Sequence, residues 1–313
     1  MATRSRYRFS TVATIVVIIA VFISGAWLLA HNRGVKGSSI LPGGVVRVIA
    51  GRPGEELNTP LDVAVAPNGQ TYVADAGNGR VQVFSRWGRP KGFLGEGKES
   101  FVYPNTVAVD AYGRVYVGDF TIGQIKVFTA RGKLLRTLDA KTVGAQIAPL
   151  DMAVGSDGCL LVADRRGAVM VLDSEGRLRK RFDRIEGASP ETLSYPNGIA
   201  EDSSGRILVA DSANRRLLLT NADGKLIRVI TNGKLTHPRG VAFFGEKYII
   251  TADTFNNRLL VFDLKGKLVK TLRAEDQPGL AYMMPNGLCV YQNRVYVADR
   301  ADNVVLVFGK EAD

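Results

Sequence analysis

A pattern of about 25 residues recurs six times along this chain of 313 residues, and this repetition constrains the fold more than any single residue does. Each copy begins at a proline and reaches an aspartate about fifteen residues later. The prolines are Pro60, Pro104, Pro149, Pro196, Pro238 and Pro285. The aspartates are Asp75, Asp119, Asp164, Asp211, Asp253 and Asp299, spaced by 44, 45, 47, 42 and 46 residues. Such regular self-similarity indicates that one structural unit is built six times.

Each copy predicts a set of antiparallel strands. Alternating Val, Ile, Leu and Tyr indicate a strand, a turn pair such as Asn68-Gly69 reverses the chain, and further apolar runs follow. A fourth, more basic strand is expected after the next turn, as in residues 133–138 (KLLRTL) and 225–230 (KLIRVI). Four antiparallel strands with a period in the forties are typical of one blade of a β-propeller. The sequence therefore predicts an all-β, six-bladed β-propeller.

The two ends of the repeat region suggest how the ring closes. The last copy stops at Phe308 with no room for a fourth strand, whereas residues 45–50 (VVRVIA) precede the first proline without a blade of their own. We expect residues 45–50 to form the outer strand of the sixth blade, because this removes an exposed sheet edge. Residues 45–313 are thus predicted to form one propeller, with no second folded domain.

The segment before the repeats predicts a transmembrane α-helix. Residues 11–30 contain no charged side chain, and twenty helical residues span a hydrocarbon core of roughly 30 Å. Three arginines and no acidic residue lie in residues 1–10, so we expect a cytoplasmic basic tip, an anchoring helix and a propeller outside the cytoplasm. Residues 31–44 resemble a flexible stalk. The alternative is a cleavable signal peptide with small residues at 24–26, after which the propeller would be secreted.

The positive charge of the chain leaves two interpretations open. The net charge is +11, and the three arginines of residues 1–10 leave about +8 on the rest. This balance favours anionic partners such as lipid headgroups, acidic polymers or nucleic acid. Alternatively, the Lys and Arg of the outer strands keep the propeller soluble and discourage edge pairing.

The repeated motif resembles NHL repeats. Its best matches are residues 73–84 (VADAGNGRVQVF), 209–220 (VADSANRRLLLT) and 251–262 (TADTFNNRLLVF), in which Ala-Asp is followed by Asn and Arg and by a short apolar strand. The resemblance covers all six copies and implies the propeller fold rather than a function. Because the Asp and Arg recur at one position of the repeat, we expect them to brace a turn and not to form an active site.

The residues that follow each proline are candidates for a metal site. In such a propeller the inner strands start near one mouth of the central channel, so these side chains should converge there. Carboxylate and amide oxygens could hold a hard cation such as Ca²⁺. The candidates are Asp62, Asn105, Asp151, Asn197 and Asn286, with Arg239 at the sixth position. The arrangement is similar to the cation sites of gluconolactonase-like and strictosidine-synthase-like propellers; the alternative is that these residues satisfy backbone groups at the strand starts.

A binding face is expected where the connections between blades gather. These connections precede the prolines and are the most variable part of the repeat, and they carry apolar and aromatic anchors beside Arg239. The candidate contacts are Tyr103, Tyr195, Arg239, Tyr282 and Met283. The alternative is that the Tyr and Met side chains pack down onto the next blade.

These observations favour binding over catalysis. The sequence contains only two histidines, His31 and His237, and no Gly-x-Ser-x-Gly nucleophile motif, so no catalytic residue is assigned. The leading hypothesis is a membrane-anchored, extracytoplasmic binding or scaffolding module for a protein or an anionic polymer. The alternative is a metal-dependent hydrolase or lyase with a cation at the channel mouth. Nucleic acid is an unlikely partner if the propeller is exported.

Overall fold

The computed structural model describes residues 41–95, 97–231, 233, 235–277 and 279–310. The predicted basic tip, the predicted transmembrane helix and most of the predicted stalk lie outside these residues. Among the described residues, no helix combines the length and apolar character needed to span a membrane. The chain from Leu41 onward forms one compact unit.

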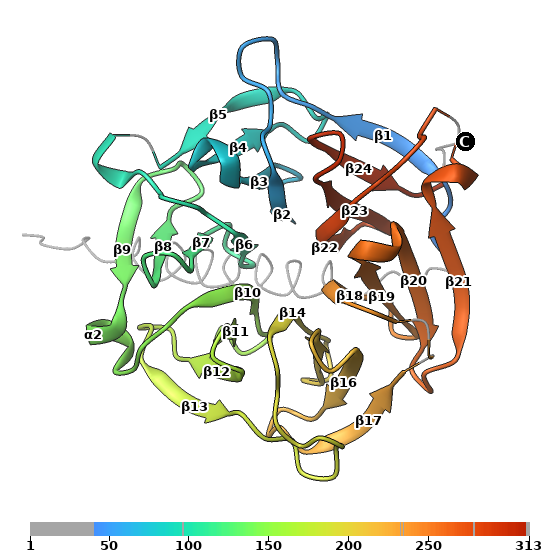
Figure 1. Cartoon of the computed structure of the whole chain (residues 1–313). Coiled ribbons are helices and arrows are strands. Elements are labelled where there is room, and N and C mark those ends of the chain that lie inside the picture. The colour runs from blue at the N-terminus through green and yellow to red at the C-terminus, as the bar shows by residue number, and fades with distance from the viewer. Residues whose placement is uncertain (1–40, 96, 232, 234, 278, 311–313) are drawn as a thin grey trace, which may run out of the picture. The chain divides into compact units, whose positions relative to one another are not determined.

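This unit contains six four-stranded antiparallel sheets arranged around a central channel (Figure 1). The innermost strands are β2 (Pro60–Val65), β6 (Thr106–Val109), β10 (Pro149–Val154), β14 (Pro196–Glu201), β18 (Pro238–Phe244) and β22 (Pro285–Tyr291). The second strands are β3 (Thr71–Asp75), β7 (Val115–Asp119), β11 (Leu160–Asp164), β15 (Ile207–Asp211), β19 (Tyr248–Asp253) and β23 (Arg294–Asp299). The all-β, six-bladed propeller is confirmed.

The outer half of each blade completes the sheet. The third strands are β4 (Arg80–Phe84), β8 (Gln124–Phe128), β12 (Ala168–Leu172), β16 (Arg216–Thr220), β20 (Arg258–Asp263) and β24 (Val304–Phe308). The outermost strands are β5 (Pro90–Leu94), β9 (Leu134–Leu138), β13 (Leu178–Phe182), β17 (Leu226–Ile230), β21 (Leu268–Arg273) and β1 (Val45–Ile49). The short helices are α2 (Ala140–Val143), η1 (Ala76–Asn78), η2 (Gly97–Glu99), η3 (Thr254–Asn256) and η4 (Ala274–Asp276).

The ring closes as predicted, between the first and last strands of the unit. β1 pairs antiparallel with β24, with Val45 opposite Phe308 and Ile49 opposite Val305. Ile49 is fully buried against the neighbouring blade. The sixth blade therefore combines three C-terminal strands with one N-terminal strand, which leaves no unpaired third strand at the seam.

The apolar core lies between neighbouring blades. The second and third strands are almost wholly buried, and each hydrophobic cluster combines side chains of two adjacent sheets. Four of the third strands carry a fully buried phenylalanine at or next to their last residue: Phe84, Phe128, Phe262 and Phe308. The outermost strands are different, since β13 and β17 expose several side chains, including those of Arg179, Arg181 and Arg228. The basic outer strands are thus solvated edges.

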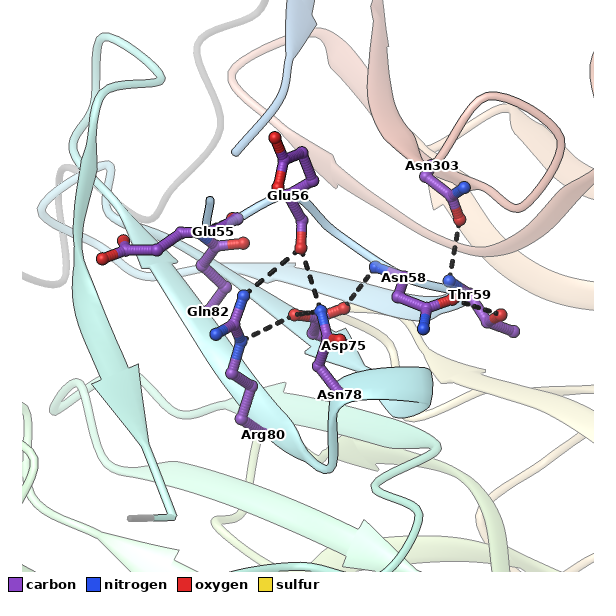
Figure 2. A network of polar contacts seen from close by, with 9 residues as sticks. All are labelled: Glu55, Glu56, Asn58, Thr59, Asp75, Asn78, Arg80, Gln82 and Asn303. Carbon is purple, nitrogen blue, oxygen red and sulfur yellow. Dashed lines mark hydrogen bonds and ion pairs between the residues drawn. The ribbon is translucent and has the colours of Figure 1, made fainter. Parts of the chain in front are cut away.

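The repeat aspartate holds the start of each blade in place. In the first blade the Asp75 carboxylate accepts hydrogen bonds from the Asn58 N–H (2.6 Å), the Asn78 side chain (2.8 Å) and Arg80 Nε (2.8 Å), as Figure 2 shows. Arg80 also donates to the Glu56 carbonyl oxygen. The fourth and fifth blades repeat the pair, with Asp211–Arg216 at 2.7 Å and Asp253–Arg258 at 2.8 Å. The expectation that the repeated Asp and Arg are structural is confirmed.

The sixth blade lacks this arginine. Val304 lies opposite Asp299, where the first, fourth and fifth blades place arginine, and Asp299 Oδ2 makes no hydrogen bond within the described residues. Asp299 Oδ1 still accepts the Met284 and Ala301 N–H groups. Burial raises the pKa of Asp299, and the nearby Asp302 raises it further. The sixth blade therefore keeps the turn contacts of Asp299 and lacks the ion pair.

Candidate functional site

The residues that follow the six prolines meet at one mouth of the channel. They line a hollow of about 70 Å³ together with Phe120 and two glycines, Gly240 and Gly287. The six residues are Asp62, Asn105, Asp151, Asn197, Arg239 and Asn286. The predicted convergence of these side chains is present, because each inner strand starts at this end of the channel.

The two carboxylates of the hollow tie neighbouring inner strands together. Asp62 accepts hydrogen bonds from the Val63 N–H (2.8 Å) and, across the blade boundary, from the Val107 N–H (2.9 Å). Asp151 accepts from the Met152 N–H (2.8 Å) and, in the next blade, from the Ile199 N–H (2.8 Å). Each carboxylate thus links two blades through backbone amides that would otherwise lack acceptors.

Thr106 joins the two carboxyl groups. Its buried hydroxyl lies 3.0 Å from Asp62 Oδ2 and 3.2 Å from Asp151 Oδ1. A hydroxyl carries one hydrogen, so it can donate to only one of these oxygens at a time. Burial and the neighbouring Asp151 raise the pKa of Asp62 well above its usual range, and burial raises the pKa of Asp151 to about 7. When one of the two carboxyl groups is protonated, it can donate a hydrogen bond to the Thr106 oxygen while the Thr106 hydroxyl donates to the other carboxylate.

Two of the three amides in the hollow, those of Asn105 and Asn286, are also hydrogen-bonded. Asn105 donates to the Pro149 and Leu150 carbonyl oxygens of the next blade (2.7 and 3.0 Å) and accepts the Phe120 N–H. Asn286 donates to the Leu61 carbonyl oxygen at 2.9 Å and accepts a hydrogen bond from Arg239. These side chains continue the ring of contacts between blades.

This donor set does not fit a cation. The oxygens of Asp62, Asp151, Asn105 and Asn286 already accept backbone, Thr106 or Arg239 donors, and the Arg239 guanidinium lies in the same hollow. The Asn197 side chain makes no hydrogen bond to the described residues. No group of three or more His, Cys, Asp or Glu side chains suited to a metal occurs among the described residues. The contacts thus favour the alternative role, in which these residues satisfy backbone groups. We derive no reaction step through a metal; the predicted calcium site stays a prediction.

Two glycines of the hollow are required by close backbone approach. A Cβ on Gly287 would lie 2.1 Å from Asp62 Oδ1, and a Cβ on Gly240 would lie 2.5 Å from the Asn286 carbonyl oxygen. Gly198 is equally confined, with the Arg239 carbonyl oxygen at 2.2 Å. The glycines of the two Pro-Asn-Gly segments and of the Pro-Arg-Gly segment thus have a packing reason in this chain.

Arginine side chains at the mouth lack carboxylate partners. Arg239 donates one hydrogen bond to Asn286 Oδ1 (3.0 Å), while its buried Nε has no acceptor among the described residues. The Nε of Arg300 is likewise buried without an acceptor in this part of the chain. Burial lowers the pKa of Arg239, and the charge of the nearby Arg300 lowers it further. No described carboxylate therefore neutralises either of these two arginine side chains.

Aromatic rings lie near the guanidinium groups of Arg239 and Arg165. The Arg239 guanidinium lies 5.7 Å from the ring centre of Phe255, whose edge contacts His237. On another blade, Arg165 lies 5.4 Å from the Phe120 ring and 5.9 Å from the Tyr195 ring. Such contacts are favourable cation–π interactions. They hold arginine side chains against apolar walls instead of against acidic residues.

The predicted binding-face residues divide into two groups. Tyr195 and Tyr282 are 44% and 46% exposed, and Tyr103 is half-buried with its ring edge-on to Phe120 at 6.2 Å. Met283 is fully buried in the core between the fifth and sixth blades. A side chain without solvent exposure cannot contact a partner, so the prediction for Met283 is wrong; its apolar side chain packs onto the neighbouring blade.

Three further mouth residues escaped the sequence reasoning: Phe120, Arg165 and Arg300. Each directly follows a repeat aspartate. The backbone N–H of Arg165 and of Arg300 donates to the residue before a blade proline, at Ala148 and Met284 respectively. The sequence signal was partial: three copies lack the usual Asn-x-Arg, and two of these have arginine at this earlier position, whereas the second copy has Phe120.

Comparisons with known proteins support the fold and leave the activity open. No curated protein matches the sequence. A catalytically inactive virginiamycin B lyase from Staphylococcus aureus, solved with quinupristin, shares 12% identity at a TM-score of 0.60 over 80% of each chain. The WD40 β-propeller domain of Doa1 shares 14% identity at a TM-score of 0.58, over 86% of this chain and 97% of that chain.

A third structure and one family complete the comparison. A protein of unknown function from Bacteroides caccae shares 17% identity at a TM-score of 0.56, over 74% of this chain and 82% of that chain. At such identities these structures support a common fold alone. Residues 57–84, which contain the aspartate network of the first blade, match the NHL repeat family. Residues 57–84, which hold the first three strands of this six-bladed propeller's first blade, are therefore an NHL repeat.

Proposed function

We propose that this protein is a binding module, anchored in a membrane by residues 11–30, whose propeller presents its channel-mouth face to an acidic protein partner outside the cytoplasm. The observation that carries the proposal is the pair of mouth arginines without a carboxylate partner among the described residues. A cationic surface that its own chain does not neutralise favours an anionic partner. The exposed Tyr195 and Tyr282 side chains supply aromatic contact area beside it.

A protein partner is favoured over an anionic polymer by the shape of the face. The hollow at the mouth is about 70 Å³, which suits one inserted group and not a continuous chain of them. A protein can insert a single acidic side chain while its surface covers the surrounding tyrosines. The hydrolase alternative has no supporting contact here, because the oxygens of Asp62 and Asp151 bind backbone amides.

Binding of defined probes to the full-length protein in detergent micelles tests this proposal. We expect an acidic peptide to bind more tightly than polygalacturonate or an RNA oligonucleotide, with weaker binding at higher salt. Replacing Tyr195 or Tyr282 by alanine should weaken peptide binding, whereas replacing the exposed Tyr112, on a blade turn, should not. Equal binding of all three probes would contradict a protein-specific face.

The membrane location is tested separately. The proposal predicts that protease added to intact cells removes a tag at the C-terminus and leaves a tag at the N-terminus intact. Recovery of the propeller in the culture medium would instead support the secreted alternative.

A further inference from the structure

We propose that Arg239 and Arg300 form an oxyanion-binding subsite at the channel mouth, which takes a single carboxylate or phosphate group. The inference deepens the proposed binding function and rests on it for the identity of the larger partner. Arg239 lies on innermost strand β18, and Arg300 directly follows β23 of the next blade. The subsite therefore lies across the boundary between the fifth and sixth blades.

Unused donors are the first argument. A guanidinium group carries five N–H donors in a planar fork that matches the oxygens of a carboxylate or phosphate. Arg239 uses a terminal nitrogen on Asn286, while the Nε of Arg239 and the Nε of Arg300 are buried without acceptors in the described structure. A buried donor without an acceptor is unfavourable, so the arrangement is stabilised by an acceptor that arrives from outside the chain.

Charge is the second argument. Arg239 and Arg300 both reach the start of β22, since Arg239 donates to Asn286 Oδ1 and the Arg300 backbone N–H donates to the Met284 carbonyl oxygen. Neither forms an ion pair with a described residue, and the charge of Arg300 lowers the pKa of Arg239. The carboxyl groups nearest in the hollow, Asp62 and Asp151, are oriented onto backbone amides and onto Thr106. They therefore bridge strands and leave the guanidinium charges without a counter-ion. A bound oxyanion would supply one.

The volume of the hollow and the side chains that line it limit which ligand group can enter. A water molecule needs about 10–15 Å³ of such space, so a hollow of about 70 Å³ holds roughly five water-sized atoms. That volume matches a phosphate or carboxylate group and is too small for a sugar ring or a nucleobase. The centre of the Phe255 ring lies 5.7 Å from the Arg239 guanidinium, and Arg239 lines the hollow. The mouth is thus suited to one oxyanion at the tip of a larger ligand.

Titration of the full-length protein in detergent tests the subsite. The probes are inorganic phosphate, acetate, and one acidic peptide with either a free or an amidated C-terminus. We expect phosphate or acetate to bind with one equivalent per chain, and R239Q or R300Q to weaken that binding by about tenfold or more, because each removes a fork of charge-assisted donors. R228Q removes the same charge from the exposed outer strand β17 and should change binding less than about twofold.

Two lysine variants separate a loss of anion binding from a loss of folding. R239K and R300K keep the charge and lose the planar fork, so an intermediate loss of affinity with an unchanged urea midpoint supports the subsite. The probes also distinguish the two kinds of ligand. Binding of phosphate alone indicates a phosphorylated ligand, whereas binding of acetate and of the free-acid peptide indicates a carboxylate ligand. If R228Q weakens phosphate binding as much as R239Q does, or if neither small anion binds, the subsite is refuted. Peptide binding that persists in that case leaves the proposed function standing, whereas loss of both removes it as well.

Discussion

The ion pair between Asp211 and Arg216 should be the most costly of the repeat motif to break. Both side chains are almost fully buried, at 0% and 2% exposed, and Arg216 Nε lies 2.7 Å from Asp211 Oδ2. Arg216 also donates to the Pro190 carbonyl oxygen in the segment that precedes the blade. Replacing Arg216 by methionine keeps apolar volume and leaves the Asp211 carboxylate buried without its main partner. The free energy of unfolding should fall by about 3–5 kcal/mol.

The magnitude can be checked against a matched pair at the surface. Arg177 contacts Asp173 through the same atoms at 2.9 Å, but the Arg177 side chain is 69% exposed. Such a pair contributes about 0.2–1 kcal/mol, so R177M should be close to wild type. For a propeller of this length, 3–5 kcal/mol corresponds to roughly 5–9 °C in melting temperature.

The assay is urea unfolding followed by tryptophan fluorescence, with thermal melts as a second readout. R216M should unfold at a clearly lower urea concentration than R177M, with an unchanged slope. If the two variants have the same midpoint, the buried pair is not what holds the segment before the fourth blade, and the structural account of the repeat motif is refuted.

Three further predictions concern the residues at the channel mouth. Burial raises the pKa of Asp151 to about 7, so the folded state binds the Asp151 proton more tightly than the unfolded chain does. The resulting contribution to the free energy of unfolding is fully present near pH 4 and is lost as the pH rises through 7, by up to about 4 kcal/mol. Urea midpoints measured against pH should therefore fall less steeply for D151N than for wild type, and parallel profiles would contradict the shift. Gly287→Ala should destabilise by more than about 2 kcal/mol, because the added methyl meets Asp62, whereas Gly54→Ala meets no atom and should cost only the roughly 1–2 kcal/mol of a left-handed backbone. EDTA and added Ca²⁺ should leave the melting temperature unchanged, and a rise with Ca²⁺ that D62N abolishes would restore the cation interpretation.

Much of the fold could be predicted because each copy of the repeat carries its own local signals. The proline, the turn residues and the alternating apolar residues specify four strands without knowledge of the rest of the chain. Counting the strands of the last copy was enough to predict that residues 45–50 form the outer strand of the sixth blade. The observed strand β1 (Val45–Ile49) ends one residue earlier than predicted. The Asp–Arg pairs were interpreted correctly because repetition at one blade position argues for a shared structural role.

The candidate site could be predicted only in part. The residues after each proline converge because inner strands share a direction, which is a property of the fold. Whether their oxygens are free is a property of neighbouring blades: Asp62 meets Val107, which lies 45 residues away in sequence. Met283 illustrates the same limit, since a residue in a variable connection can still point into the core. Arg300 was overlooked because the position after the repeat aspartate gains its meaning only once the ring closes.

The most direct test of the mouth as an anion-binding site is the isothermal titration of inorganic phosphate into the full-length wild-type protein and into R300Q. The account predicts one equivalent bound by the wild type and an affinity about tenfold or more lower for R300Q. Equal affinity in the two proteins would contradict it, because the anion would then be held by charge spread over the surface and not by the two guanidinium groups at the mouth.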